Sequence, residues 1–162
     1  MWELRAEHGI PILGKSLAWD GEFDAESYTL AAAHRWFVSD RIALGAQFSA
    51  TRWQLDGRHR YGGELMGTSR WFFAELNELE QMGFFFDLNG GALITNGPFP
   101  PLGTDFNFAF SFGPGLEIPI NDRTSFVGAI QYHHVSNALG SGNDRNPSQN
   151  EVRIWIGVGL LW

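Results

Sequence analysis

The sequence lacks cysteine, is poor in charge and has no long apolar run. Without cysteine, the chain can form neither a disulfide scaffold nor a Cys-ligated zinc or iron–sulfur centre. Charged residues make up 18% of the chain, below the roughly 25% of an ordinary soluble domain. The formal net charge of −7 argues against a nucleic-acid-binding protein, which needs a basic stripe. No stretch approaches the ~18–20 apolar residues of a membrane-spanning helix.

A length of 162 residues suits one domain with one core, and no linker, low-complexity tract or charge block divides the chain. We therefore expect a single domain over residues 1–162. Met1 is followed almost at once by Glu3, Arg5 and Glu7, so no signal peptide is visible. The protein is therefore either cytosolic or the product of leader removal.

Apolar and polar side chains alternate along much of the sequence, and this period of two is typical of β-strands. In residues 104–120, Phe106, Phe108, Phe110 and Phe112 share one face. A helix would scatter these rings around its circumference. The alternation predicts about eight strands of ~9–13 residues, the length that a tilted membrane strand needs. We expect them at residues 2–10, 28–38, 42–51, 65–73, 84–89, 104–120, 126–132 and 152–162.

The apolar face of the predicted sheet carries side chains too large for the inside of a small barrel. Eight strands enclose room only for packed side chains, and a row of phenylalanine rings would overfill it. The other face carries small, polar and charged residues, which fit a narrow polar interior. We therefore predict an all-β fold, an eight-stranded antiparallel transmembrane β-barrel with an apolar exterior and a polar packed lumen. The terminal aromatic residue, Trp162, fits the last strand of a bacterial outer-membrane barrel.

The predicted connections alternate in length. Short polar turns are expected at residues 39–41 and 121–123, and a somewhat longer one at 77–81. Longer loops are expected at residues 11–26, 54–63, 96–103 and 138–149. Because outer-membrane barrels have short periplasmic turns and long outer loops, both termini should lie in the periplasm. The seventh strand then ends near His134 at the level of the outer leaflet.

Polar side chains interrupt the apolar face at this strand end. His134 and Ser136 are two residues apart and project on the lipid-facing side, where uncompensated polar groups are costly. A serine becomes nucleophilic beside a base, and histidine is the usual one. Asn137 follows, where its amide or a nearby backbone N–H could hold an oxyanion. The pattern predicts a nucleophilic serine that is activated by a histidine base.

Two residues on the last strand are candidates to orient the histidine. Glu151 has the more favourable chemistry, because a carboxylate stabilises imidazolium. Asn150 has the more favourable position, because it shares the lipid face of Val152 and Ile154. A bulge near the loop would bring Glu151 to that face instead.

The segment His134-Val135-Ser136-Asn137-Ala138, followed by Asn146-Pro147-Ser148-Gln149-Asn150, resembles the site of lipid A 3-O-deacylases of the PagL type. The resemblance extends over residues 84–162. It implies an integral protein of the Gram-negative outer membrane that hydrolyses the ester of the 3-hydroxyacyl chain at position 3 of lipid A. The resemblance implies that a serine and a histidine act together without a metal or other cofactor, and they correspond to Ser136 and His134.

The resemblance assigns two further positions. The family's glutamate corresponds by spacing to Asn150, unless Glu151 takes its place, and the oxyanion amide corresponds to Asn137. The implied partner is lipid A or lipopolysaccharide in the outer leaflet, and a homodimer is compatible with the sequence. Two rival interpretations remain: a non-catalytic small outer-membrane barrel with a structural or adhesion role, and a soluble carrier with an apolar lumen.

Overall fold

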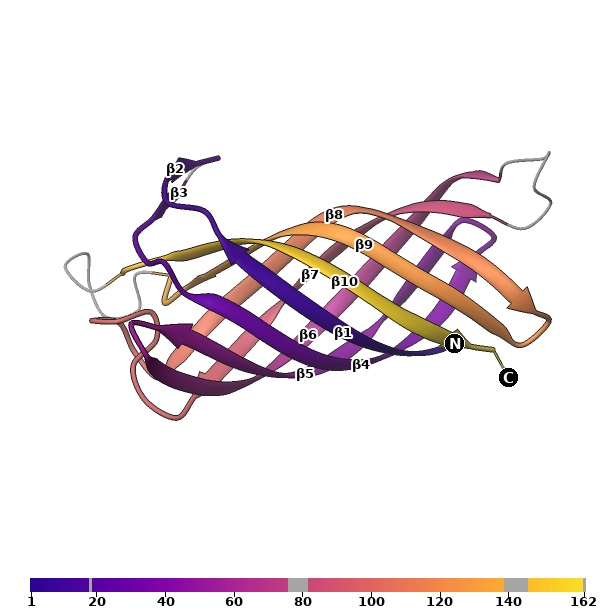
Figure 1. The fold of residues 1–162 in the computed structure, drawn as a ribbon. Helices are drawn as coiled ribbons and strands as arrows, with labels where there is room; N and C mark the ends of the chain where they lie inside the picture. The colour runs from indigo at the N-terminus through magenta and orange to yellow at the C-terminus, as the bar shows by residue number, and fades with distance from the viewer. Residues whose placement is uncertain (18, 76–81, 139–145, 162) are drawn as a thin grey trace.

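The computed structural model describes residues 1–17, 19–75, 82–138 and 146–161, which form a barrel and a small hairpin (Figure 1). The barrel strands are β1 (Trp2–Pro11), β4 (Glu26–Ser39), β5 (Ile42–Leu55), β6 (Arg58–Glu75), β7 (Gly83–Thr95), β8 (Phe106–Asn121), β9 (Thr124–Ser136) and β10 (Gln149–Leu160). The hairpin consists of β2 (Gly14–Ser16) and β3 (Trp19–Gly21). Within the described ranges, no helix is long and apolar enough to cross a membrane.

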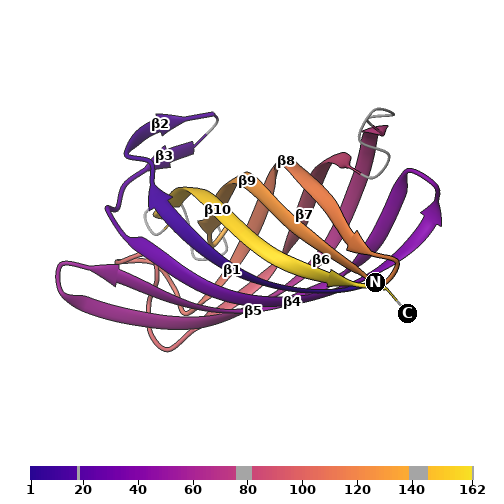
Figure 2. The same ribbon diagram turned by 45° about the vertical axis from the view of Figure 1, so that its right-hand side comes forward.

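Consecutive barrel strands pair in an antiparallel manner, and β1 closes the cylinder by pairing with β10. The closing register runs from Trp2 opposite Leu160 to Pro11 opposite Glu151. Both termini lie at one end of the barrel, and the β2–β3 hairpin lies outside the wall at the other end (Figures 1 and 2). The predicted fold class, an eight-stranded antiparallel barrel, is confirmed.

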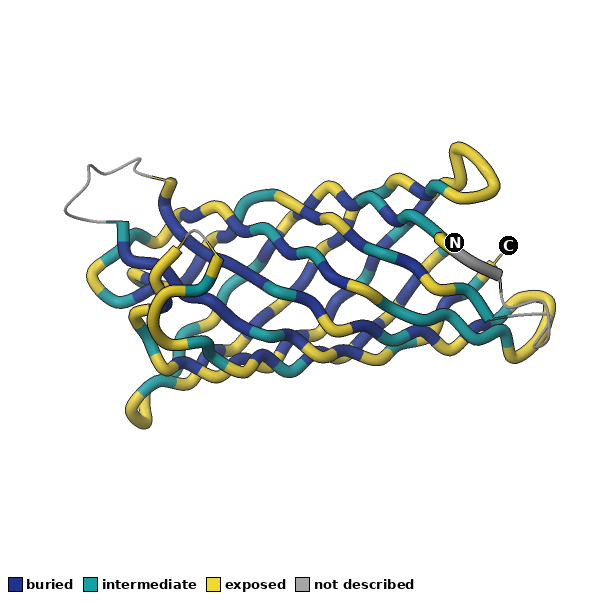
Figure 3. The backbone as a smooth tube through the Cα atoms, turned by 90° about the horizontal axis from the view of Figure 1, so that it is seen from above, coloured by how far each residue is buried: buried dark blue, intermediate teal, exposed yellow. Residues whose placement is uncertain are grey.

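Buried and more exposed residues alternate along most of the barrel wall, as Figure 3 shows. On β8, Phe106 and Phe108 are each 49% exposed on the outer face, whereas Asn107 and Ser111 are buried on the inner face. The apolar exterior predicted from the phenylalanine row is therefore confirmed.

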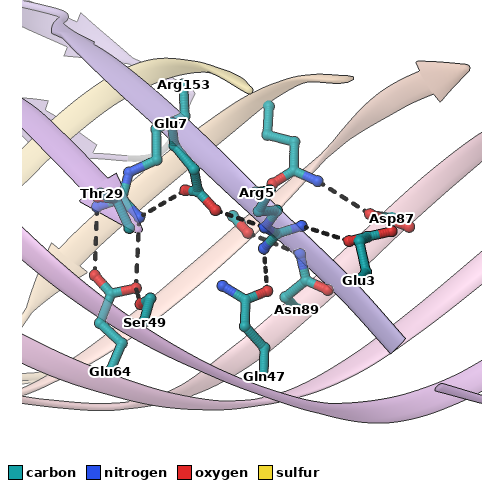
Figure 4. Close-up of polar contacts among 12 residues, drawn as sticks. Glu3, Arg5, Glu7, Thr29, Gln47, Ser49, Glu64, Asp87, Asn89 and Arg153 are labelled. Atoms are coloured by element: carbon teal, nitrogen blue, oxygen red, sulfur yellow. Dashed lines mark hydrogen bonds and ion pairs between the residues drawn. The ribbon is translucent and has the colours of Figure 1, made fainter. Parts of the chain in front are cut away.

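The lumen contains paired charges, which Figure 4 shows in part. Arg70 binds Asp87 through two contacts, Nε to Oδ1 at 2.8 Å and Nη2 to Oδ2 at 2.9 Å. Glu3 lies 3.0 Å from Arg70 and 3.3 Å from Arg35. Buried charges are tolerated when they are paired and hydrogen-bonded. This polar packing argues against the carrier interpretation, which requires an apolar lumen.

The structure corrects one predicted connection. The expected loop over residues 54–63 is instead a tight hairpin, because β5 continues to Leu55 and β6 begins at Arg58. The two residues between them, Asp56 and Gly57, both have positive φ angles, of 49° and 73°. This conformation suits a two-residue hairpin turn, for which Asp-Gly is a favoured sequence. The connection predicted at 77–81 lies outside the described residues, as do residues 139–145 of the last predicted loop.

The connection between β1 and β4 also differs from a plain loop, because it contains the β2–β3 hairpin. Two backbone hydrogen bonds join its base to the strand that carries the orienting candidates. The Ile12 N–H donates to the Asn150 carbonyl at 2.8 Å, and the Glu22 N–H donates to the Ser148 carbonyl at 3.2 Å. The hairpin is thereby held against the beginning of β10.

Candidate active site

The three candidate side chains His134, Ser136 and Asn150 come from neighbouring strands of the barrel wall. His134 lies directly opposite Asn150 on β10 and opposite Phe110 on β8. Ser136 is the last residue of β9 and shares the outer face with His134, as strand periodicity requires. The sequence therefore positions all three groups through strand register alone.

The three side chains form a hydrogen-bonded chain. His134 Nδ1 lies 2.7 Å from Asn150 Oδ1, and His134 Nε2 lies 2.9 Å from Ser136 Oγ. An amide oxygen can only accept, so Nδ1 carries the proton and donates it to Asn150. Nε2 then has a free lone pair and accepts from the serine hydroxyl. This is the arrangement that a base needs in order to activate a serine.

These hydrogen-bonded side chains are buried although they lie on the outer face of the barrel. His134 is 2% exposed and Ser136 is 7% exposed, whereas Ile130 on the same face of β9 is 55% exposed. The cover is Trp19 of β3, whose ring centroid lies 4.7 Å from that of His134 and 5.0 Å from that of Phe110. The hairpin thus packs over the imidazole on the outside of the wall.

Sequence reasoning did not identify Trp19 as part of the site. It precedes Asn150 by 131 positions, and the two meet only because the hairpin folds back over the wall. No motif in residues 11–26 indicates this contact. The one available signal was the closure of the barrel, which brings the end of β1 beside the start of β10.

The carboxylate of Glu151 lies on the lumenal side of the wall. Its Oε2 accepts hydrogen bonds from Ser27 Oγ at 2.8 Å and Arg153 Nε at 3.0 Å, and its Oε1 accepts one from Trp53 Nε1 at 3.1 Å. Of the two orienting candidates, the structure therefore brings Asn150, and not Glu151, to His134. The bulge that would have brought Glu151 to the outer face is absent from the β9–β10 pairing, which runs in unbroken register from Gln149 to Leu160.

His133 faces the lumen, as its parity with Gln131 predicts. Its Nε2 lies 3.4 Å from Glu64 and its Nδ1 lies 3.8 Å from Glu151. Adjacent residues of β9 therefore place one imidazole in the lumenal ionic network and the other on the outer wall. In the part of the chain that the structure describes, no group of three His, Cys, Asp or Glu residues is arranged to hold a metal ion.

Asn137, the oxyanion candidate, directly follows Ser136 and is 4% exposed. Ala138 comes next with a φ of 50°, in the left-handed region. The chain therefore turns sharply as it leaves β9, and the backbone N–H groups here differ in direction from those of the strand. Leu139 and Gly140, the next two residues of the chain, lie outside the described residues.

Comparisons with known proteins show the family and the fold of the chain. A family model described as "Lipid A 3-O-deacylase (PagL)" matches residues 26–158. None of the curated proteins matches the sequence significantly. The crystal structure of the outer membrane enzyme PagL superposes with a TM-score of 0.66 at 17% identity, covering 96% of this chain and 97% of that one. At this identity the superposition shows a shared fold.

Two further solved structures align less well. The outer membrane protein AlkL in lipid bilayers has a TM-score of 0.44 at 13% identity, covering 98% of this chain and 86% of that one. The Yersinia pestis outer membrane protein Ail, in a phospholipid nanodisc, has a TM-score of 0.40 at 13% identity, covering 96% of this chain and 98% of that one.

Proposed function

Because the chain belongs to the lipid A 3-O-deacylase (PagL) family, we propose that it is an outer-membrane serine esterase. Its substrate is the ester that links a 3-hydroxyacyl chain to position 3 of lipid A. Ser136 is the nucleophile, His134 the general base and acid, and Asn150 the group that orients His134. The observation that carries this assignment is the 2.9 Å contact between Ser136 Oγ and His134 Nε2 on the outer wall.

The reaction proceeds by acyl transfer to Ser136 and then to water. Ser136 Oγ attacks the ester carbonyl carbon while its proton moves to His134 Nε2. The tetrahedral intermediate collapses, the bond between the carbonyl carbon and the sugar oxygen breaks, and His134 returns the proton to that oxygen. Water, deprotonated by His134, then attacks the acyl-serine. The products are a free 3-hydroxy fatty acid and the deacylated lipid, and the enzyme regains its starting protonation.

Asn150 keeps the imidazole in the tautomer that this sequence of steps requires. Its Oδ1 accepts from Nδ1–H at 2.7 Å, which leaves Nε2 unprotonated and directed at the serine. An amide is neutral, so it stabilises the imidazolium less than a carboxylate would. We therefore expect a working but slower base than one paired with a buried carboxylate.

The negative charge of the tetrahedral intermediate needs hydrogen-bond donors next to Ser136. Asn137 is the adjacent residue and offers both a side-chain amide and a backbone N–H at the sharp turn after β9. Donors fixed before the reaction stabilise an oxyanion without further reorganisation. Asn137 is therefore proposed as an oxyanion donor.

The position of the site also suits a substrate held in a membrane. The serine and imidazole lie on the outer wall at the end of β9, and β9 ends at the barrel end opposite the termini (Figure 1). Tight turns join β4 to β5 and β8 to β9 at the terminal end, as expected for the periplasmic side. A lipid ester at the outer leaflet can therefore approach the site sideways, without entering the lumen.

Mass spectrometry of lipid A from cells that express the chain tests this function. We expect the loss of one 3-hydroxyacyl group in cells with the unmodified chain and no loss with Ser136→Ala. Ser39→Ala, at the exposed last residue of β4, is the matched control and should behave like the unmodified chain. Identical lipid A in cells with the unmodified chain and with Ser136→Ala would support the non-catalytic barrel instead.

A further inference from the structure

We propose that the main-chain carbonyl of Trp19 orients the Asn150 amide and thereby selects the His134 tautomer. The β2–β3 hairpin is then a positioning element of the site as well as its cover. This inference rests on the proposed function, because it explains why Nε2 of the proposed base, His134, is unprotonated and can accept the serine proton. An amide differs from a carboxylate in charge and also in having two unlike ends, of which one accepts and the other donates hydrogen bonds.

Both ends of the Asn150 side chain have partners. Oδ1 lies 2.7 Å from His134 Nδ1, and Nδ2 donates to the Trp19 carbonyl oxygen at 3.3 Å. Rotation of the amide by half a turn would place Oδ1 against the Trp19 carbonyl oxygen, where two acceptors repel. Asn150 is fully buried, so water does not compensate for that loss. The Trp19 carbonyl therefore selects one orientation of the amide.

The orientation of the amide decides what the imidazole can do. With Oδ1 toward the ring, Nδ1 must carry the proton and Nε2 is a lone-pair acceptor for Ser136. With Nδ2 toward the ring, Nδ1 would be the acceptor and Nε2 would carry the proton. The ring would then donate to Ser136 Oγ and could not remove its proton. The tautomer, and with it the nucleophile, depends on a carbonyl that lies in another element of the fold.

The hairpin is anchored to hold that carbonyl in place. Its base is bonded to β10 at Asn150 itself, through the Ile12 N–H, and at Ser148, through the Glu22 N–H. The Ser148 hydroxyl also donates to the Asp20 carbonyl. A β-carbon on Gly21 would lie 1.8 Å from the Ile12 carbonyl oxygen and 3.4 Å from Asn150 Nδ2, so the two ends of the hairpin are tightly apposed there.

The carbonyl and the indole of Trp19 have separable roles. The indole packs on His134 and Phe110 and limits access to the site. The carbonyl belongs to the backbone, so Trp19→Ala keeps it and removes only the ring. Replacement of residues 13–20 by two glycines removes both, and the close approach of Gly21 to Ile12 allows this short link. These two variants distinguish orientation of the amide from cover of the site.

The tautomer can be read directly from nitrogen chemical shifts of 15N-histidine-labelled protein in detergent micelles. His134→Gln assigns the His134 signals by their disappearance. We expect the Nδ1–H form in the unmodified chain and in Trp19→Ala. We expect the Nε2–H form to rise to at least a third of the population in the two-glycine variant. An unchanged tautomer in the folded two-glycine variant would overturn the proposal. A changed tautomer in the Trp19→Ala variant would also overturn it.

Activity provides a second, independent test through Asn150→Asp. A carboxylate has two equivalent acceptor atoms, so it holds the same tautomer without help from the hairpin. We expect the two-glycine link to lower kcat at least tenfold when Asn150 is present and less than threefold in the Asn150→Asp background. Equal losses in both backgrounds would show that the hairpin acts only as a cover and would overturn the proposal.

The two readouts also separate this inference from the proposed function. If the chain does not deacylate lipid A, the tautomer measurement still tests the role of the Trp19 carbonyl. If deacylation occurs but the tautomer ignores the hairpin, the function stands and the inference fails. Heat-dependent migration on denaturing gels, which distinguishes folded from unfolded barrels, verifies that each variant is folded before it is compared.

Discussion

Asn150 and Glu151 are adjacent in the sequence but lie on opposite sides of the barrel wall. The amide of Asn150 contacts His134 on the outside, and the carboxylate of Glu151 contacts Arg153 and Trp53 in the lumen. One strand thus contributes to the candidate site with one residue and to the lumenal network with the next. The two residues should therefore respond to mutation in opposite ways.

Asn150→Ala should lower activity strongly and stability weakly. The substitution removes the acceptor from His134 Nδ1, and loss of the correct tautomer costs a serine hydrolase roughly 10²–10⁴-fold in kcat. Turnover of lipid A by the purified protein, followed as release of 3-hydroxy fatty acid, measures the loss. A variant with full activity would exclude Asn150 from the site.

Glu151→Gln should lower stability strongly and activity weakly. It removes a buried charge that faces Arg153 and His133, and an uncompensated buried charge costs about 3–5 kcal/mol. The midpoint of thermal unfolding, followed by gel migration, should fall clearly. The activity of the protein that remains folded should stay within about threefold, because this carboxylate does not touch the imidazole that contacts Ser136.

Asp87→Asn should destabilise the ionic network in the half of the lumen that is nearer the chain termini. Asp87 receives two hydrogen bonds from Arg70 and one contact from Arg35 at 3.4 Å. An amide leaves both guanidinium groups short of negative charge, so we expect a loss of about 3–5 kcal/mol. Urea unfolding in detergent measures it. Asn89→Ser, a change of a neutral lumenal residue on the same strand, is the control and should cost much less.

Leu88→Arg tests the orientation of the wall in a membrane. Leu88 lies near the middle of β7 and is 46% exposed. A charged side chain near the bilayer midplane costs a barrel roughly 2–4 kcal/mol. Unfolding from lipid vesicles should show this cost, whereas Leu88→Met should be nearly neutral. An equally small effect of both changes would contradict a lipid-facing position for this residue.

Most of the barrel could be predicted because its information is local. The alternation on residues 106–112 fixes which face is apolar, and residue size decides which face is outside. The same parity placed His134, Ser136 and Asn150 on one wall. The β5–β6 turn was missed although Asp56-Gly57 is a recognisable signal, because the alternation there is weak and the loop was expected to be long.

The cover of the site could not be predicted in the same way. The contact of Trp19 with His134 depends on how a short hairpin docks on strands that are remote in sequence. Nothing in the local pattern of residues 14–21 indicates a partner, since polar and small residues there are also typical of an exposed loop. Strand register predicts that the three polar groups lie on one face. Their burial depends on the tertiary structure and could not be predicted from register.

The outward position of Ser136 has a kinetic consequence. With Ser136 as the proposed nucleophile, a lipid ester would reach this side chain by lateral diffusion within a leaflet, so the encounter would be two-dimensional and depend on the number of substrate molecules per unit of surface. In mixed micelles, added detergent should slow turnover by surface dilution even when the bulk concentration of substrate is constant. The enzyme would thus respond to the composition of the surface around it and not to the volume of the compartment.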